Sequence, residues 1–321
     1  MKEVWVKELE PGTDVNEKFV VRKIEVKEYS GKSFLSLEFG DNTGRIGGVC
    51  WEAADDYHRR IKPGNVVVVE GKVGTYRDVP QISVMSMSRV AQKDYDPIDY
   101  LPRGKRDPKL LIKEIDEIIE GVKDLHYRSL LSEIFSDGIL RRQFIFTPAA
   151  KLWHHSHVGG LAEHTLNVAK LAVMVCEVYK DIEIDRDLLV TGALLHDLGK
   201  AETYSLDNFF DYTDDGRLIG HIAIADRIIG NKIARLTGFP AEKKRLIRHL
   251  VLSHQGTYDQ ASPVLPQTLE ANILYVLDLL DSRVGGILKV LDKPRQPGQR
   301  WSGYVKLLER YLYLGDNLKE E

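Results

Sequence analysis

The feature that most constrains this chain is a change in the spacing of its hydrophobic residues near residue 100. Before that point, short stretches rich in Val, Ile, Phe and Tyr alternate with turn residues, which is typical of β-strands. From Pro108 onward, apolar residues recur every three or four positions, as in Leu111, Ile115 and Ile118, which indicates amphipathic helices. We therefore expect a β domain followed by a helical domain, and 321 residues leave room for two hydrophobic cores.

The N-terminal part contains five predicted strands and one short predicted helix. The strands are expected at 17–27, 33–40, 44–51, 66–76 and 81–90, and the helix at about 52–61. Five strands with a helix after the third is the order of an OB-fold, a small Greek-key barrel that often binds single-stranded nucleic acid. An SH3-like barrel fits the same pattern. We expect residues 1–92 to form this small all-β barrel.

Alternation along the second predicted strand indicates which side chains fill the barrel. Leu35, Leu37 and Phe39 share one face and are expected to point inward, so Phe34 points outward. Outward aromatic residues on this strand of an OB-fold commonly stack on bases, which makes Phe34 a candidate substrate-binding residue. The alternative is that Phe34 packs beneath a loop. Trp51 is expected in the core.

A stretch of Pro, Gly and Asp among polar neighbours separates the two patterns. We expect residues 93–108 to be a linker and residues 109–321 to be an all-helical domain. The fold class predicted from the sequence is therefore multidomain, with an all-β OB-fold barrel followed by an all-α domain.

Composition excludes several classes of protein. Hydrophobic residues make up 43% and charged residues 29%, as in ordinary folded proteins. The longest apolar run, at 171–176, is far shorter than the roughly 18 residues of a membrane span, and the N-terminus lacks the apolar core of a secretion signal. We therefore expect a cytoplasmic protein that does not enter a membrane. A net charge of −3 means that binding to nucleic acid must depend on local patches or on a metal.

The residues available for chemistry are mainly histidines and carboxylates. Cys50 and Cys176 form no CxxC pair, so any metal must be held by His, Asp or Glu. His196 and Asp197 directly follow an apolar helical segment at 188–195. An adjacent imidazole and carboxylate at the buried end of a helix cost desolvation free energy, which a bound metal ion would offset.

This ordered set of residues resembles the HD-domain superfamily of metal-dependent phosphohydrolases, which are helical proteins named for the adjacent His-Asp pair. The segments GGLAEHT and HDLGK carry the most specific part of the resemblance. The superfamily pattern of His, His-Asp, two further His and a last Asp is matched by His164, His196, Asp197, His221, His254 and Asp278. The resemblance implies that these six residues bind two divalent ions, with Asp197 bridging them. Asp281 is an alternative last ligand.

Nearly the whole chain is similar to the YhaM-type 3′-to-5′ exoribonucleases, which join an N-terminal OB-fold to a C-terminal HD domain. Further matches are His155 and His157 before the paired glycines, whereas Gln255 departs from a second His expected after His254. The resemblance implies a metal-dependent 3′-to-5′ exonuclease that hydrolyses the phosphodiester bonds of single-stranded RNA, with DNA left open. The alternative is an HD phosphohydrolase that acts on a free nucleotide or a cyclic dinucleotide.

The residues near the expected ligands suggest individual roles. Asp197 is expected to orient the activated water, and the Lys200 ammonium to neutralise a phosphate oxygen in the transition state. The alternative for Lys200 is an ordinary lysine at a helix C-terminus. His155 and His157 are candidates for contacts to the substrate phosphate or sugar.

The ligand types do not select the metal, because imidazole and carboxylate groups suit several divalent ions. The resemblance favours two Mn²⁺ ions, while iron, cobalt, nickel and zinc stay open. Whether the chain forms a homo-oligomer is also left open by the sequence.

Overall fold

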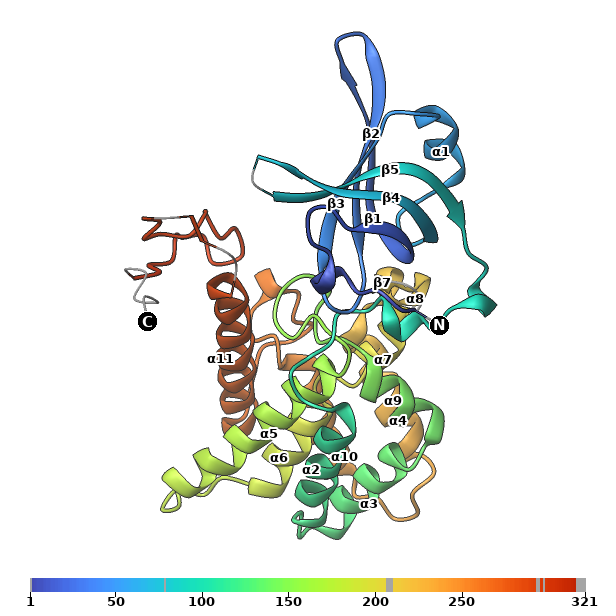
Figure 1. Cartoon of the computed structure of the whole chain (residues 1–321). Helices are drawn as coiled ribbons and strands as arrows, with labels where there is room; N and C mark the ends of the chain where they lie inside the picture. Colours follow the sequence, from blue (N-terminus) through green and yellow to red (C-terminus); the bar gives the residue numbers. More distant parts are fainter. Residues whose placement is uncertain (1, 78, 206–209, 293–294, 297, 316–321) are drawn as a thin grey trace. The chain divides into compact units, whose positions relative to one another are not determined.

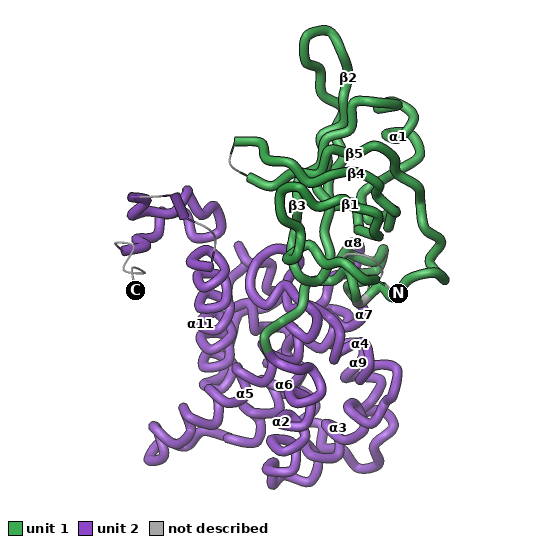
Figure 2. Tube along the Cα trace, in the orientation of Figure 1, with its two compact units in different colours: residues 1–105, 203–217 green, residues 106–202, 218–321 purple. Residues whose placement is uncertain are grey.

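The structure is a computed structural model, and it describes residues 2–77, 79–205, 210–292, 295–296 and 298–315. The chain divides into two compact units, which Figure 2 draws in different colours. Unit 1 comprises residues 1–105 and 203–217, and unit 2 comprises residues 106–202 and 218–321. Among the described residues, no helix has the length and apolar character needed to cross a membrane.

Unit 1 contains a closed five-stranded barrel (Figure 1). Its elements are β1 (Asp14–Tyr29), β2 (Lys32–Gly40), β3 (Arg45–Cys50), α1 (Ala54–Arg60), β4 (Val66–Tyr76) and β5 (Val79–Arg89). The strand order is β1-β2-β3-β5-β4, and β3 pairs with β5 in parallel while the other neighbours are antiparallel. This topology, with α1 between β3 and β4, confirms the predicted OB-fold.

The barrel interior follows the predicted alternation, because Leu35, Leu37 and Phe39 are buried. The prediction that Trp51 lies in the core is wrong, since its side chain is 50% exposed. β3 ends at the buried Cys50, which pairs with Leu35, so the next residue leaves the barrel wall beside Phe34. Trp51 stacks on Phe34 with ring centroids 4.6 Å apart and planes 29° apart. The two rings form an aromatic pair on the outside of the barrel.

The segment after the barrel is not polar throughout. It contains two short 3-10 helices, η2 (Gln92–Asp94) and η3 (Pro97–Asp99), followed by the buried side chains of Tyr100 and Leu101. Tyr100 clusters with Val20 and Val66 of the barrel strands. Much of the predicted linker therefore packs with unit 1.

The helical part contains ten helices among the described residues (Figure 1). They are α2 (Pro108–Glu120), α3 (Leu125–Phe135), α4 (Gly138–Phe146), α5 (Gly160–Val178), α6 (Arg186–Leu195), α7 (Lys200–Thr203), α8 (Asp214–Leu218), α9 (His221–Ile233), α10 (Ala241–Ser253) and α11 (Leu269–Leu291); the last 3-10 helix is η4 (Tyr258–Gln260).

The second part is helical, as expected, and contains one short two-stranded ladder in addition. Strand β6 (Tyr204–Ser205) pairs with β7 (Asp211–Tyr212), and residues 203–217 group with unit 1. The rings of Tyr204 and Tyr212 lie 4.9 Å apart across this ladder. Strands of two residues are too short to leave a recognisable alternation in the sequence.

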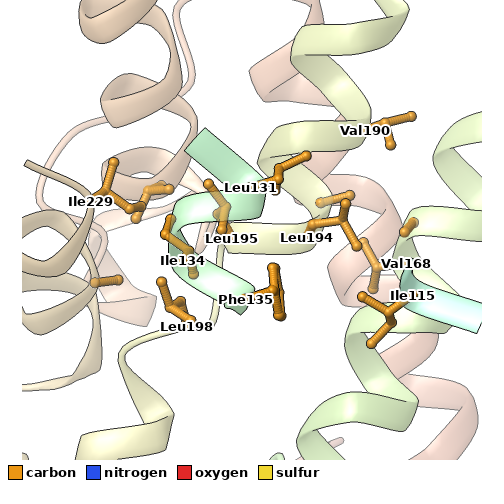
Figure 3. Packing of buried hydrophobic residues seen from close by; sticks show 14 of the residues in the cluster. Ile115, Leu131, Ile134, Phe135, Val168, Val190, Leu194, Leu195, Leu198 and Ile229 are labelled. Carbon is orange, nitrogen blue, oxygen red and sulfur yellow. The ribbon is translucent and has the colours of Figure 1, made fainter. Parts of the chain in front are cut away.

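Helix α6 occupies the middle of the helical core. Every residue from Leu188 to Leu195 is buried, and the Asp185 side chain caps the helix by accepting from the backbone N–H of Leu188 (2.9 Å). Figure 3 shows Leu194 and Leu195 among side chains from the surrounding helices. The polar residues that follow Leu195 therefore lie at the end of a buried run of eight residues.

Candidate metal centre

Six histidine and aspartate side chains from five segments of the helical part converge beside the core. They are His164 on α5, His196 and Asp197 just after α6, His221 at the start of α9, His254 at the end of α10, and Asp278 on α11. Three of the four imidazoles and the carboxylate of Asp197 are almost completely buried, and the His221 side chain is 25% exposed. These are the six residues that the resemblance implies as metal ligands.

The first group of donors surrounds the Nε2 atom of His164. This nitrogen lies 3.1 Å from His196 Nε2, 3.1 Å from Asp278 Oδ1 and 3.4 Å from Asp197 Oδ2. His196 Nε2 lies 3.4 Å from the same Asp197 oxygen. Two nitrogens and two carboxylate oxygens therefore face one point.

The second group of donors faces the other oxygen of Asp197. Asp197 Oδ1 lies 3.5 Å from His221 Nε2 and 3.6 Å from His254 Nε2. Within the described part of the chain, Asp197 Oδ1 and His221 Nε2 are buried and have no hydrogen-bond partner. Because buried polar atoms are nearly always satisfied, these two atoms point to a missing ligand.

The spacing of the donors fits divalent metal ions. Ligands about 2.1 Å from an ion lie about 3.0 to 3.4 Å from one another, which is close to the separations in both groups. Asp197 gives one oxygen to each group and is therefore placed to bridge two ions. The donors are imidazole nitrogens and carboxylate oxygens, and neither group includes a thiolate.

Three of the histidine rings are held in place by a hydrogen bond at Nδ1, the ring nitrogen that points away from the other donors. In each case the Nδ1 atom is bound to an oxygen, which leaves Nε2 directed at the neighbouring donors. The acceptors are the carbonyl oxygens of Ala193 for His196 (2.8 Å) and Val251 for His254 (2.7 Å), and the carboxylate of Asp281 for His164 (2.6 Å). Outer hydrogen bonds of this kind accompany almost all metal-binding histidines.

Electrostatics keeps the second group in the form that binds metals. Burial lowers the pKa of His221 to about 3 and also lowers the pKa of His254, so both imidazoles are neutral. Burial alone would raise the pKa of Asp197, but the charge of Lys200 and contacts with the neighbouring imidazoles hold it well below its usual range. A neutral imidazole and an ionised carboxylate are the states required for coordination.

In the first group, the neighbouring carboxylates favour a proton on His164. Burial alone would lower the pKa of His164, but hydrogen bonds with Asp197, Asp278 and Asp281 outweigh it and raise this pKa well above its usual value. Since histidine binds metals as the neutral ring, a divalent ion here would replace this proton.

Gly199, in the HDLGK segment, allows α9 to approach the His-Asp pair. A Cβ atom at this position would lie 2.0 Å from the carbonyl oxygen of His221 and 2.6 Å from the backbone nitrogen of Ala225. Both neighbours are backbone atoms at the start of α9, so no side-chain rotation can relieve the clash. The glycine therefore permits the close contact that sets His221 beside Asp197.

Four further residues were predicted to take part in catalysis or substrate binding, and they have different surroundings. Lys200 Nζ lies 2.6 Å from Asp197 Oδ2 and is almost buried. A carboxylate engages one ring nitrogen of each of the two other histidines: His155 Nε2 lies 2.9 Å from Asp281 Oδ2, and His157 Nε2 lies 2.8 Å from Glu163 Oε2. Their predicted contact with substrate stays a prediction. Phe34 lies in the barrel of unit 1.

Sequence reasoning missed the role of the residues around Asp281. Asp281 lies on the Nδ1 side of His164, whereas Asp278 lies on the Nε2 side with the other donors. Gln255, the departure from the expected pattern, places its amide nitrogen 3.0 Å from His254 Nε2. The side chain of Gln255 must turn away for His254 to bind an ion.

Comparisons with known proteins agree with this architecture. Residues 161–283 match the HD domain family, and residues 19–90 match a family described as an OB-fold nucleic acid binding domain. These two matches fall on the helical part that carries the six donors and on the barrel of unit 1, respectively.

Curated relatives match most of the chain. It is 31% identical over 285 residues to the 3′-5′ exoribonuclease YhaM of Bacillus pumilus, and the match covers 88% of this chain and 89% of that protein. The proteins of the same name from Bacillus subtilis and a Geobacillus species are each 30% identical over 285 residues, covering 89% and 86% of their lengths. The chain therefore belongs to the family of YhaM 3′-5′ exoribonucleases.

Proposed function

We propose that this protein is a metal-dependent exoribonuclease that removes nucleotides from the 3′ end of single-stranded RNA by hydrolysis. The observation that carries the proposal is the buried carboxylate of Asp197, whose two oxygens face two separate groups of metal-type donors. Family membership supports RNA as the substrate and 3′-to-5′ as the direction.

In this proposal, the six donors are divided between two metal ions. Two ions about 3.5 to 4 Å apart stabilise both the attacking and the leaving oxygen of a phosphodiester displacement. The first ion would be held by His164, His196 and Asp278, the second by His221 and His254, and both by Asp197.

Two residues would act on the reacting groups. Asp197, whose pKa is held low, would stay ionised and orient the attacking water. Lys200 lies 2.6 Å from Asp197 and would neutralise a phosphate oxygen as charge develops in the transition state. Its near burial strengthens this interaction, because a cation removed from water is poorly screened.

Manganese is the metal in this proposal. Nitrogen and oxygen donors without sulfur are compatible with Mn²⁺ and disfavour the ions that prefer thiolates. The proposal also includes a cytoplasmic location, which is supported by the free thiols of Cys50 and Cys176.

The barrel offers a surface for single-stranded RNA. Trp51 is half exposed and stacks on Phe34, and the ring of Tyr29 meets Trp51 edge-on at 6.5 Å. Bases of a single strand stack on such aromatic rings irrespective of sequence. In the proposed function, Phe34 and Trp51 hold the RNA strand on the 5′ side of the bond that is cleaved.

The proposal is tested with two otherwise identical single-stranded RNAs, one labelled at its 5′ end and the other at its 3′ end. With Mn²⁺ present, we expect gradual shortening of the 5′-labelled RNA and immediate release of a labelled mononucleotide from the 3′-labelled RNA. Prior removal of metal should abolish both. Intact RNA together with hydrolysis of a free nucleotide or a cyclic dinucleotide would overturn the proposal in favour of the alternative.

A further inference from the structure

We infer that Asp281 is a positioning residue of the metal centre, which binds no ion itself and holds the ring of His164 in the orientation that coordination requires. The inference rests on the proposed function, because it concerns the metal site of that function. It adds an outer layer of residues to the six expected ligands.

The two carboxylates on α11 contact opposite edges of the same imidazole. Asp278 Oδ1 lies 3.1 Å from Nε2 of His164, on the side of the other donors. Asp281, one helical turn later, accepts a hydrogen bond from Nδ1 of His164 at 2.6 Å. One aspartate therefore lies with the ligand set, and the other lies behind the ring.

This hydrogen bond determines which nitrogen of His164 can bind an ion. A neutral imidazole has one N–H and one lone pair, and donation from Nδ1 to Asp281 leaves the lone pair on Nε2. The contact also prevents rotation of the ring and increases the basicity of Nε2. Loss of the carboxylate would permit the wrong tautomer and free the ring.

Asp281 is itself fixed by two other side chains. His155 Nε2 lies 2.9 Å from the same oxygen that contacts His164, and the amide nitrogen of Asn167 donates to the other oxygen at 2.9 Å. Only 7% of Asp281 is exposed. A carboxylate with three partners on both oxygens has little capacity left for a metal ion.

The backbone around His155 is adapted to this contact. His155 has φ of +42°, a left-handed conformation that is strained for a residue with a Cβ. On α11, a Cβ at Gly285 would lie 3.2 Å from His155 Nε2, so the glycine gives the imidazole room to reach Asp281. Both features indicate that the position of His155 matters.

The test compares Asp281→Asn with the matched change Asp278→Asn on the same helix. Equilibrium dialysis against Mn²⁺, followed by mass spectrometry of the protein, gives the number of ions bound and their affinity. For the wild type we expect two ions per chain. Asp281→Asn should still bind two ions at saturation, with one site weakened about 10- to 100-fold. Asp278→Asn should lose one ion at every concentration used.

A second readout separates positioning from ligation. At saturating Mn²⁺, hydrolysis of RNA by Asp281→Asn should recover towards the wild-type rate, whereas Asp278→Asn should not recover. Wild-type affinity in Asp281→Asn would overturn the inference, and so would outright loss of an ion in that variant with retention in Asp278→Asn. Wild-type protein that binds no Mn²⁺ would instead overturn the proposed function.

Two further variants decide the matter if Asp281→Asn does not fold. Asn167→Ala and His155→Ala each remove one partner of the Asp281 carboxylate and leave His164 in contact with it. Each should weaken binding of one Mn²⁺ ion several-fold. Unchanged affinity in both variants would overturn the inference.

Discussion

Each buried histidine of the metal centre presents the same ring nitrogen, Nε2, to its neighbours. For His164, His196 and His254 this follows from a hydrogen bond at Nδ1 to a fixed oxygen. These polar groups lie beside a hydrophobic core, where unpaired charge is costly. The centre is therefore best explained as a preorganised set of ligands.

Replacement of His196 by Ala should abolish the activity. This side chain is completely buried and its Nε2 lies among the donors of the first group, so its loss removes a ligand and leaves Asp197 poorly compensated. We expect the rate of RNA hydrolysis to fall at least about 100-fold, with loss of one bound metal ion. Rates and metal content are measured on the same preparation.

The matched control is His249→Ala on α10. His249 lies five residues before His254, and its Nε2 accepts a hydrogen bond from the backbone N–H of Gln267 at 2.9 Å. The loss of this contact should lower stability slightly and leave metal content unchanged. An equal fall in activity for both variants would contradict the assignment of His196 as a ligand.

At the residue scale, the sequence predicted which side chains come together, but it could not predict how these side chains are oriented. All six expected ligands converge, because the order of His and Asp residues along the chain identified them. Asp278 and Asp281 are three residues apart on one helix, so their spacing leaves both on similar faces. Only the position of the His164 ring between them distinguishes the two carboxylates.

Among the secondary-structure elements, the start of α9 should be displaced by the addition of a single methyl group at Gly199. In Gly199→Ala the new methyl group would meet backbone atoms of His221 and Ala225, so α9 must move away from Asp197. We expect loss of the second metal ion and a fall in activity greater than the fall in stability. Metal content and Tm are compared in the wild type and the variant.

Gly230→Ala is the control, because a Cβ at this position on α9 has no atom within 4 Å among the described residues. It should leave activity unchanged and raise stability slightly, since alanine favours helices. If Gly199→Ala retained both ions, the close approach of α9 would not be needed for the centre.

The N-terminus of α4 should make stability depend on pH. Asp137 accepts hydrogen bonds from the backbone N–H groups of Ile139 and Leu140 and pairs with Lys232 on α9 at 3.0 Å. The Leu140 N–H and then the Lys232 ammonium lower the pKa of Asp137 below its usual value. A carboxyl whose pKa is lower in the folded state adds stability above its unfolded pKa, about 3.9, and loses it as pH falls.

Asp137→Asn keeps an amide oxygen as the helix cap and removes the charge. Its Tm should be lower than that of the wild type at pH 7, and the difference should shrink towards pH 3 as the wild-type carboxyl becomes protonated. Thermal unfolding at both pH values provides the measurement. A difference in Tm that stays constant with pH would contradict this role of the charge.

The strands and long helices were predictable because their hydrophobic periods extend over many residues. β4 spans the residues expected for it, whereas the ladder of β6 and β7 has too few residues to show a period. Trp51 lies outside the core although its ring is large and apolar, because it directly follows the inward-facing Cys50 at the end of β3.

At the scale of the whole molecule, we expect the barrel to bind the RNA strand and the helical part to hydrolyse it. In the double variant Phe34→Ala, Trp51→Ala, the aromatic pair is lost while the metal donors are untouched. We expect the KM for a long single-stranded RNA to rise about 10-fold or more, because each lost base stack costs about 1 to 3 kcal/mol. Hydrolysis of a small phosphodiester reporter should be unchanged.

Tyr179→Ala is the control for this experiment. Tyr179 is also a half-exposed aromatic residue, and it caps the far end of α5, about 22 Å along the helix from His164. This variant should change neither the KM for the long RNA nor the hydrolysis of the small reporter. Equal losses on the long RNA and the small reporter in the double variant would contradict the division of labour.

The order of a barrel followed by helices was predictable from the change of hydrophobic period. The grouping of residues 203–217 with unit 1 was not, because it depends on contacts between segments far apart in the sequence. The burial of Tyr100 in the predicted linker has the same origin, since its partners Val20 and Val66 lie on strands of the barrel.

The central claim is that Asp197 bridges two metal ions. Anomalous diffraction from crystals grown with Mn²⁺ tests it most directly. We predict two peaks per chain, about 3.5 to 4 Å apart, with one oxygen of Asp197 bound to each ion. A single peak, or two peaks of which Asp197 contacts only one, would contradict it.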